Sequence, residues 1–99
     1  MSCTIKDIKF DCLRKMLLFV AGNAPNSVSA QANLRQVCEQ RLKNGWELKI
    51  IDVLEDYGTA LDHGILVTPA LVILEPLPAV TVFGDLSDTD RLLKALRLI

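Results

Sequence analysis

The chain has few of the residues from which metal sites, disulfide scaffolds and redox centres are built. It has three cysteines, one histidine and an aromatic content of 5% over 99 residues. Three widely spaced cysteines (Cys3, Cys12 and Cys38) suit neither a disulfide framework nor a zinc site, so we expect buried or incidental reduced thiols. The single histidine, His63, has one neighbouring carboxylate, Asp62, and no second histidine with which to form a metal site. We expect a helix-terminal or surface histidine and no metal.

Long apolar runs and basic excess are also missing. No run approaches the roughly 20 residues of a membrane span, and the segment 1–11 has no apolar stretch of the secretory kind. We therefore expect a cytoplasmic protein without membrane contact. The formal net charge of −1 lacks the positive excess that phosphate neutralisation needs, so no nucleic-acid partner is expected. The hydrophobic content of 51% predicts one globular domain over residues 1–99, with 1–12 as a flexible extension.

The first half of the chain predicts a strand, a helix and a second strand. The apolar run 15–20 ends in turn residues and is typical of a strand buried on both faces. Asn26 or Ser27 is the expected N-cap of the following helix. The run 46–53 predicts the second strand, parallel to the first because the crossover is helical. The buried helix stripe is expected at Ala30, Leu34, Val37, Cys38 and Leu42.

The second half predicts a helix, two strands and a final helix. The helix is expected over 54–61, with an apolar side at Leu54, Tyr57, Leu61 and Ile65. Asp52 is either a buried acid or the cap of this helix, and capping explains it more simply. Strands over 70–74 and 79–83 flank a turn that holds Pro76 and Pro78, which favours an antiparallel pair. The last helix follows Asp88, with Leu92, Leu93 and Leu96 inward.

The resulting order, β-α-β-α-β-β-α with a proline before the third strand, is that of thioredoxin-like α/β folds. Pro69 is therefore the candidate for a cis peptide bond. A thioredoxin-type enzyme places a reactive cysteine at the start of the first helix, and residues 22–27 contain none. Ser27 could take that place, but a capping role explains it more simply. We expect no redox activity of that kind.

No other catalytic set is visible. Asp85, Asp88 and Asp90 could ligate a cation, yet capping of a helix start explains them more simply. There is no glycine-rich phosphate loop and no nucleophile with a matching base. We expect a binding protein without a cofactor and not an enzyme.

Five ordered segments together resemble the KaiB family of circadian clock proteins, over residues 15–98. They are LFVAGNAPNS (18–27), LKIIDVL (48–54), ILVTP (65–69), PLP (76–78) and GDLSD (84–88). The resemblance implies a partner, KaiC, which is a hexameric RecA-like ATPase with kinase and phosphatase activity. It also implies two folds: a ground state of order βαββααβ, usually tetrameric, and a thioredoxin-like monomer that binds KaiC.

The resemblance further implies that residues 54–99 refold between these two states, so a dimer or tetramer is the alternative to a monomer. A slow switch would be consistent with proline isomerisation at Pro69, Pro76 and Pro78. The segment 84–88 matches the place where changes alter the balance of the folds. The candidate partner-binding or fold-switch residues are Asp52, Gly64, Pro69, Pro76, Pro78, Gly84, Asp85 and Asp88.

The chain departs from the family pattern where basic residues are common. Glu55, Gly64, Val80 and Thr81 stand at those positions, which puts docking on an acidic ATPase surface in doubt. Val80 and Thr81 also raise strand propensity and so favour the thioredoxin-like fold. Three functions stay open: a regulator of a KaiC-type ATPase, a non-redox adaptor that binds a histidine kinase or other protein, and a thiol enzyme acting through Cys12 or Cys38.

Overall fold

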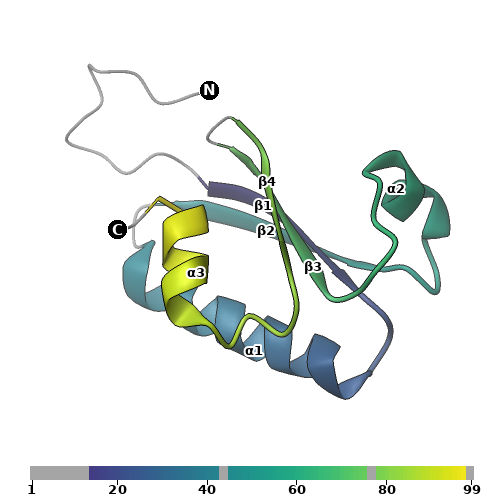
Figure 1. The fold of residues 1–99 in the computed structure, drawn as a ribbon, viewed down its shortest axis with the longest axis horizontal. Coiled ribbons are helices and arrows are strands. Elements are labelled where there is room, and N and C mark those ends of the chain that lie inside the picture. The colour runs from purple at the N-terminus through teal and green to yellow at the C-terminus, as the bar shows by residue number, and fades with distance from the viewer. Residues whose placement is uncertain (1–13, 43–44, 76–77, 98–99) are drawn as a thin grey trace.

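A four-stranded sheet with helices on both faces forms the molecule (Figure 1). The computed structural model describes residues 14–42, 45–75 and 78–97. In chain order the elements are β1 (Arg14–Val20), α1 (Pro25–Arg41), β2 (Trp46–Asp52), α2 (Tyr57–Asp62), β3 (Ala70–Glu75), β4 (Val80–Phe83) and α3 (Thr89–Ala95). The strand order is β2-β1-β3-β4. β1 and β2 are parallel, and β3 is antiparallel to both β1 and β4. The predicted thioredoxin-like order is confirmed.

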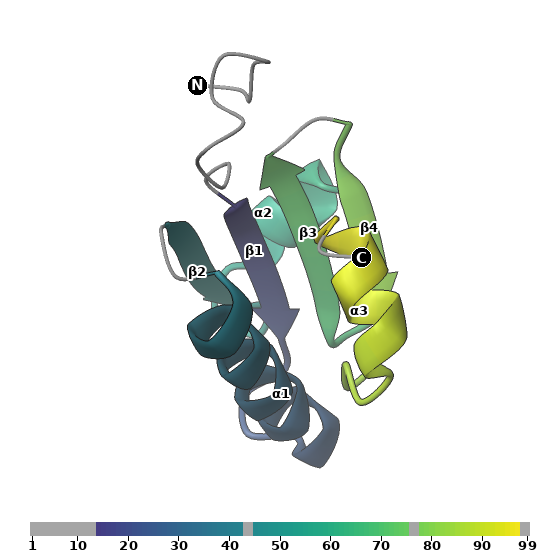
Figure 2. The same ribbon diagram turned by 90° about the vertical axis from the view of Figure 1, so that its left-hand side faces the viewer.

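Helices α1 and α3 cover one face of the sheet (Figure 2). The predicted stripe of α1 is buried, because Ala30, Leu34 and Cys38 have no exposed surface and Val37 and Leu42 have little. Leu92, Leu93 and Leu96 close the same core from α3. This core includes Met16 and Leu18 of β1, so the helical and strand periodicities in the sequence meet on one face.

Helix α2 and the segment after it cover the opposite face. Phe19 and Ile51 of the sheet pack there with Ala60 of α2 and with Ile65, beside Ala70 and Val72 of β3. Ile50 packs into the first core and Ile51 into the second. The prediction that this pair would fill both faces of β2 is confirmed, as expected for a strand whose alternate side chains point to opposite sides.

The start of α1 differs from the prediction. The helix begins at Pro25 with Ala24 as its N-cap, and no side chain caps it. Ser27 lies inside the first turn, where its hydroxyl accepts the N–H of Ala21 at 3.1 Å. The predicted capping by Asn26 or Ser27 is therefore wrong, because a proline at the first position already fixes a helical φ and has no N–H to satisfy.

Helix α2 is shorter than predicted and has a different cap. It begins at Tyr57, and the Asp56 carboxylate accepts the Thr59 N–H at 3.2 Å and the Thr59 hydroxyl at 2.8 Å. Residues 52–56 form a turn in which the Asp52 carbonyl accepts the N–H groups of Glu55 and Asp56. The prediction that Asp52 caps this helix is wrong, since this turn delays the helix by three residues.

The connection from β4 to α3 follows the prediction more closely. The Asp88 carboxylate accepts the Arg91 N–H at 3.1 Å and so caps α3. Asp85 accepts the Ser87 N–H at 3.0 Å within the turn, and Asp90 lies in the first helical turn. The capping interpretation is confirmed for Asp88, whereas Asp85 stabilises the turn before the helix. The Thr68–Pro69 peptide bond is cis, as predicted.

Candidate partner-binding surface

Three of the predicted residues meet at the end of the sheet where β1, β2 and β4 finish and β3 begins. One carboxylate oxygen of Asp52 accepts the Gly22 N–H at 3.1 Å and the Leu54 N–H at 3.0 Å. Gly22 has φ +54, and a β-carbon there would lie 3.3 Å from Leu54. Asp52 therefore ties the turn after β1 to the turn after β2.

Pro69 and Gly84 extend the same end of the sheet. Pro69 is buried, and its carbonyl accepts the Gly84 N–H at 3.0 Å. Gly84 has φ +107, a conformation that other residues adopt only at a cost. This contact fixes the exit of β4 against the entry of β3.

The other predicted residues lie elsewhere. Pro78 is on the connection between β3 and β4, at the opposite end of the sheet, and its carbonyl accepts a guanidinium N–H of Arg97 at 3.3 Å. Pro76 lies outside the described residues. Asp85 and Asp88 precede α3, and the Asp85 carbonyl accepts the amide of Asn33 on α1 at 2.9 Å. The predicted set is thus spread over both ends of the sheet.

The four positions that depart from the family's basic pattern do not share one surface. Glu55 and Gly64 are exposed on either side of α2. Thr81 is exposed on β4, whereas Val80 packs against the core beneath α1 and α3. Successive side chains of a strand point to opposite faces. Val80 therefore acts in packing, and only the other three positions are open to a partner.

Five exposed apolar side chains around α2 form a surface that the sequence analysis missed. We call it the α2 patch: Leu54, Tyr57, Leu61, Leu66 and Val67, with exposed fractions from 47% at Leu61 to 83% at Leu66. The helical spacing predicted an inward apolar side at four positions, and only Ile65 is buried. That prediction is wrong for the other three, because α2 has only six residues and begins after Leu54.

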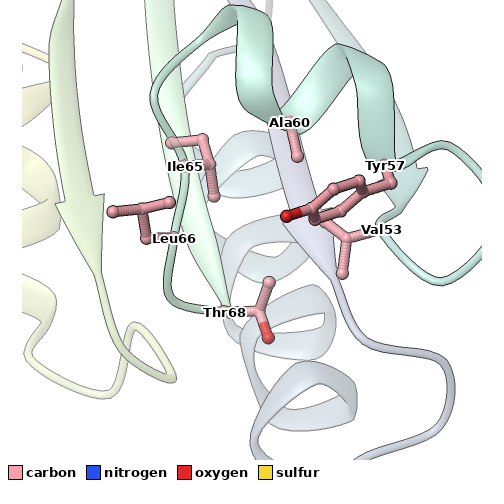
Figure 3. A pocket seen from close by; sticks show the side chains of 6 residues that line it. All are labelled: Val53, Tyr57, Ala60, Ile65, Leu66 and Thr68. Carbon is pink, nitrogen blue, oxygen red and sulfur yellow. The ribbon is translucent and has the colours of Figure 1, made fainter.

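A pocket opens within the α2 patch (Figure 3). Its volume is about 150 Å³, and Val53, Tyr57, Ala60, Ile65, Leu66 and Thr68 line it. In Figure 3, Tyr57 and Val53 stand on one side and Ile65 and Leu66 on the other, with Thr68 at the end nearest β3. Apart from the tyrosine and threonine hydroxyls, these side chains are hydrocarbon. The pocket therefore suits an apolar group.

Carboxylates outnumber cations around the patch. Residues 50–90 contain eight Asp and Glu residues and no Lys or Arg. Glu55, Asp56 and Asp62 are exposed beside the patch. Hydrogen bonds from the Thr59 side chain and backbone, and to a smaller extent the positive charge of Lys49 on β2, lower the pKa of Asp56, so this carboxyl stays ionised near neutral pH. The gap in basic residues is visible in the sequence and could have directed attention to this surface.

The thiol and histidine have surroundings that fit structural roles. Burial raises the pKa of Cys38 to about 11, so the prediction of a buried thiol is confirmed and its reactive thiolate form is suppressed. Cys3 and Cys12 lie outside the described residues. His63 is the C-cap of α2, and its ring centroid lies 5.7 Å from that of Phe19. The predicted helix-terminal position is confirmed.

Two absences hold for the described part of the chain. Over residues 14–42, 45–75 and 78–97, no three Cys, His, Asp or Glu side chains are grouped so that they could hold a metal ion. Across those same ranges, no helix has the length and apolar character needed to cross a bilayer.

Comparison with known proteins decides the family. Residues 17–98 match the KaiB domain. The chain belongs to the KaiB family. The circadian clock oscillator protein KaiB of Nostoc punctiforme is 44% identical over 82 residues, which cover 83% of this chain and 79% of that protein. The KaiB of Synechococcus elongatus is 43% identical over the same length, covering 83% and 80%. The predicted resemblance is confirmed.

Solved structures confirm the thioredoxin-like fold of this KaiB-family chain. The N-terminal domain of Synechococcus elongatus SasA matches with a TM-score of 0.72 at 21% identity, over 100% of this chain and 93% of that domain. Mitochondrial thioredoxin 3 of Saccharomyces cerevisiae matches with a TM-score of 0.70 at 15% identity, over 87% and 78%. At these identities the likeness concerns the fold alone.

Proposed function

We propose that this KaiB-family chain is a non-catalytic, cytoplasmic clock regulator. In the proposal it binds a KaiC-type RecA-like ATPase in the thioredoxin-like fold and modulates the phosphorylation cycle of that enzyme. The observation that carries the proposal is the identity of 43–44% to circadian clock KaiB proteins over 83% of the chain. The exposed α2 patch supports it, because a group of exposed apolar side chains beside a pocket is typical of interaction sites on small proteins.

Size-exclusion chromatography with light scattering tests this function. The protein is run alone and after a day of incubation with the KaiC-type ATPase of the same genome and ATP. We expect a joint peak and a changed phosphorylation time course of the ATPase. No association at tens of micromolar would contradict the proposal. The run without ATPase separates an 11.0 kDa thioredoxin-like monomer from the dimer or tetramer that the alternative fold would form.

A second candidate is a non-redox adaptor that binds a histidine kinase. The observation that favours it is the absence of basic residues at the exposed positions Glu55, Gly64 and Thr81. The fold shared with the N-terminal domain of SasA is compatible with such a module. Incubation with histidine kinases of the same genome distinguishes the two. A joint peak with a kinase, and none with the ATPase, would move the function to this candidate.

We also propose that the segment 84–88 sets the balance between the two folds. Gly84 has φ +107, and Leu86 is buried with φ +62, a conformation that costs a leucine about 1–3 kcal/mol. Replacing Gly84 by alanine adds a further cost of about 1–2 kcal/mol to the thioredoxin-like fold. We expect Gly84→Ala to increase the oligomer fraction in light scattering, with Gly58→Ala, in a helix, as the control. Equal fractions would contradict this role.

A further inference from the structure

The α2 patch has the composition of the centre of a protein interface. Its five apolar side chains lie within residues 54–67, and two of them, Tyr57 and Leu66, line the same pocket. A single exposed apolar residue is ordinary, but a cluster of them around a hollow is not. The pocket of about 150 Å³ is large enough for one benzene-sized group. It can therefore hold one bulky apolar side chain.

The rim of the patch carries three exposed carboxylates, with one cation, Lys49, near Asp56. Glu55 follows Leu54 in the chain, Asp56 precedes Tyr57, and Asp62 follows Leu61; all three carboxylates are exposed. Along the chain, Lys49 is the last cation before Arg91. An apolar centre with a charged, wet rim is the usual anatomy of an interface between proteins. The sign of the rim determines which partners are attracted and which are repelled.

We infer that the partner segment covering the α2 patch is basic: it inserts one bulky apolar side chain into the pocket and places Lys or Arg beside Glu55 and Asp62. The inference rests on the proposed function, in which the ATPase supplies this segment. An acidic ATPase surface, which suits a regulator with basic residues at these positions, would be repelled here. The α2 patch thus selects an ATPase of the opposite surface charge.

Charge reversal tests the rim. The double variant Glu55→Lys/Asp62→Lys changes two exposed carboxylates for which the described structure shows no hydrogen-bond role. Glu39→Lys/Asp90→Lys is the matched control, with the same net charge and with both changes on α1 and α3, across the sheet. We expect the first variant to weaken binding of the ATPase by at least about tenfold and the control by less than about threefold.

The salt dependence of binding and the replacement of an apolar side chain by serine test the charged rim and the apolar centre of the patch. Raising NaCl from about 0.05 to 0.5 M should weaken wild-type binding at least about tenfold, and the double variant should lose most of this dependence. Leu66→Ser should weaken binding about tenfold. Val28→Ser, which changes an exposed side chain on α1, should have little effect. Circular dichroism checks that each variant keeps the fold.

Two results separate this inference from the proposed function. If wild type binds the ATPase and charge reversal leaves the affinity unchanged or improves it, the inference is overturned and the function stands. If wild type binds no ATPase, the function is overturned. The inference is then tested by the binding of two synthetic peptides to the α2 patch. One peptide carries phenylalanine between lysines, the other phenylalanine between glutamates.

Amide chemical shifts over residues 54–67 are the readout for these peptides. Selective shifts with the lysine peptide support the inference, and equal shifts or none overturn it. A second copy of this chain is the other occupant to test, because α3 carries Arg91, Lys94 and Arg97. A salt-sensitive oligomer that charge reversal dissolves would show that the partner is this chain itself and would overturn the inference.

Discussion

The two faces of the sheet differ in how many apolar side chains they bury. On the face covered by α1 and α3, fifteen of the described residues form one buried cluster, with Leu18, Leu34 and Leu96 fully enclosed. On the α2 face the buried cluster has six described residues, and the covering helix has six residues against seventeen in α1. Burial supplies most of the folding free energy. The first face therefore supplies most of the stability, and the second is free to carry recognition.

The largest expected contrast comes from removing one leucine side chain on each face. Leu34→Ala leaves a cavity in the first core and should lower the free energy of unfolding by about 3 kcal/mol. Leu61→Ala, on the half-exposed side of α2, should change it by less than about 0.5 kcal/mol. Urea denaturation followed by circular dichroism measures both. Equal losses would show that the α2 face contributes as much stability as the other.

A buried arginine gives the next largest effect. Arg14 is 6% exposed, and its Nε donates to the Leu96 carbonyl at 3.0 Å, which joins the start of β1 to the end of α3. Arg14→Leu replaces the charged side chain by an apolar one and leaves that carbonyl without this donor, so we expect a loss of about 2 kcal/mol. The control is Lys15→Leu, at an exposed neighbour. If the control lowers the free energy of unfolding as much, the effect comes from the leucine in the strand and not from the lost hydrogen bond.

Asp52 should contribute less, because its position at the sheet end is only partly buried. Asp52→Ala removes the acceptor for two backbone N–H groups, and water can replace part of it; we expect a loss of about 1 kcal/mol. Asp52→Asn keeps an oxygen acceptor and should recover most of that loss. If asparagine behaves like alanine, the negative charge matters more than the two hydrogen bonds.

The smallest effect is local to α2 and depends on pH. Because the Thr59 hydrogen bonds lower the pKa of Asp56 in the folded protein, the cap contributes fully above the ordinary aspartate pKa and is lost as the pH falls below it. Hydrogen exchange of the α2 amides, corrected for intrinsic rates, should therefore accelerate several-fold at acidic pH. Amides of α1 should be unaffected, and Asp56→Ala should already exchange fast at neutral pH.

How far the sequence predicts this structure also differs between the faces. β1 and α1 were predictable because a short apolar run closed by turn residues is typical of a buried strand and the stripe over residues 30–42 has the helical period. The caps of α1 and α2 were not, since Ser27 and Asp52 bond to backbone N–H groups of other turns, which depend on how the chain packs. Helix α2 is too short for its spacing to fix a buried side. The α2 patch could be predicted only in its charge, from the gap in basic residues.

The segregation of charge also has a practical consequence for mapping contacts. Trypsin has no cleavage site between Lys49 and Arg91, so α2, β3 and β4 leave a digest as one peptide spanning residues 50–91. Amine-reactive cross-linkers have no lysine to attack across this peptide. A carbodiimide, which joins carboxylates to amines, would instead couple Glu55 or Asp62 directly to a lysine of whatever protein rests on α2. The segment 50–90 is therefore unreactive toward amine-directed reagents but open to carbodiimide coupling.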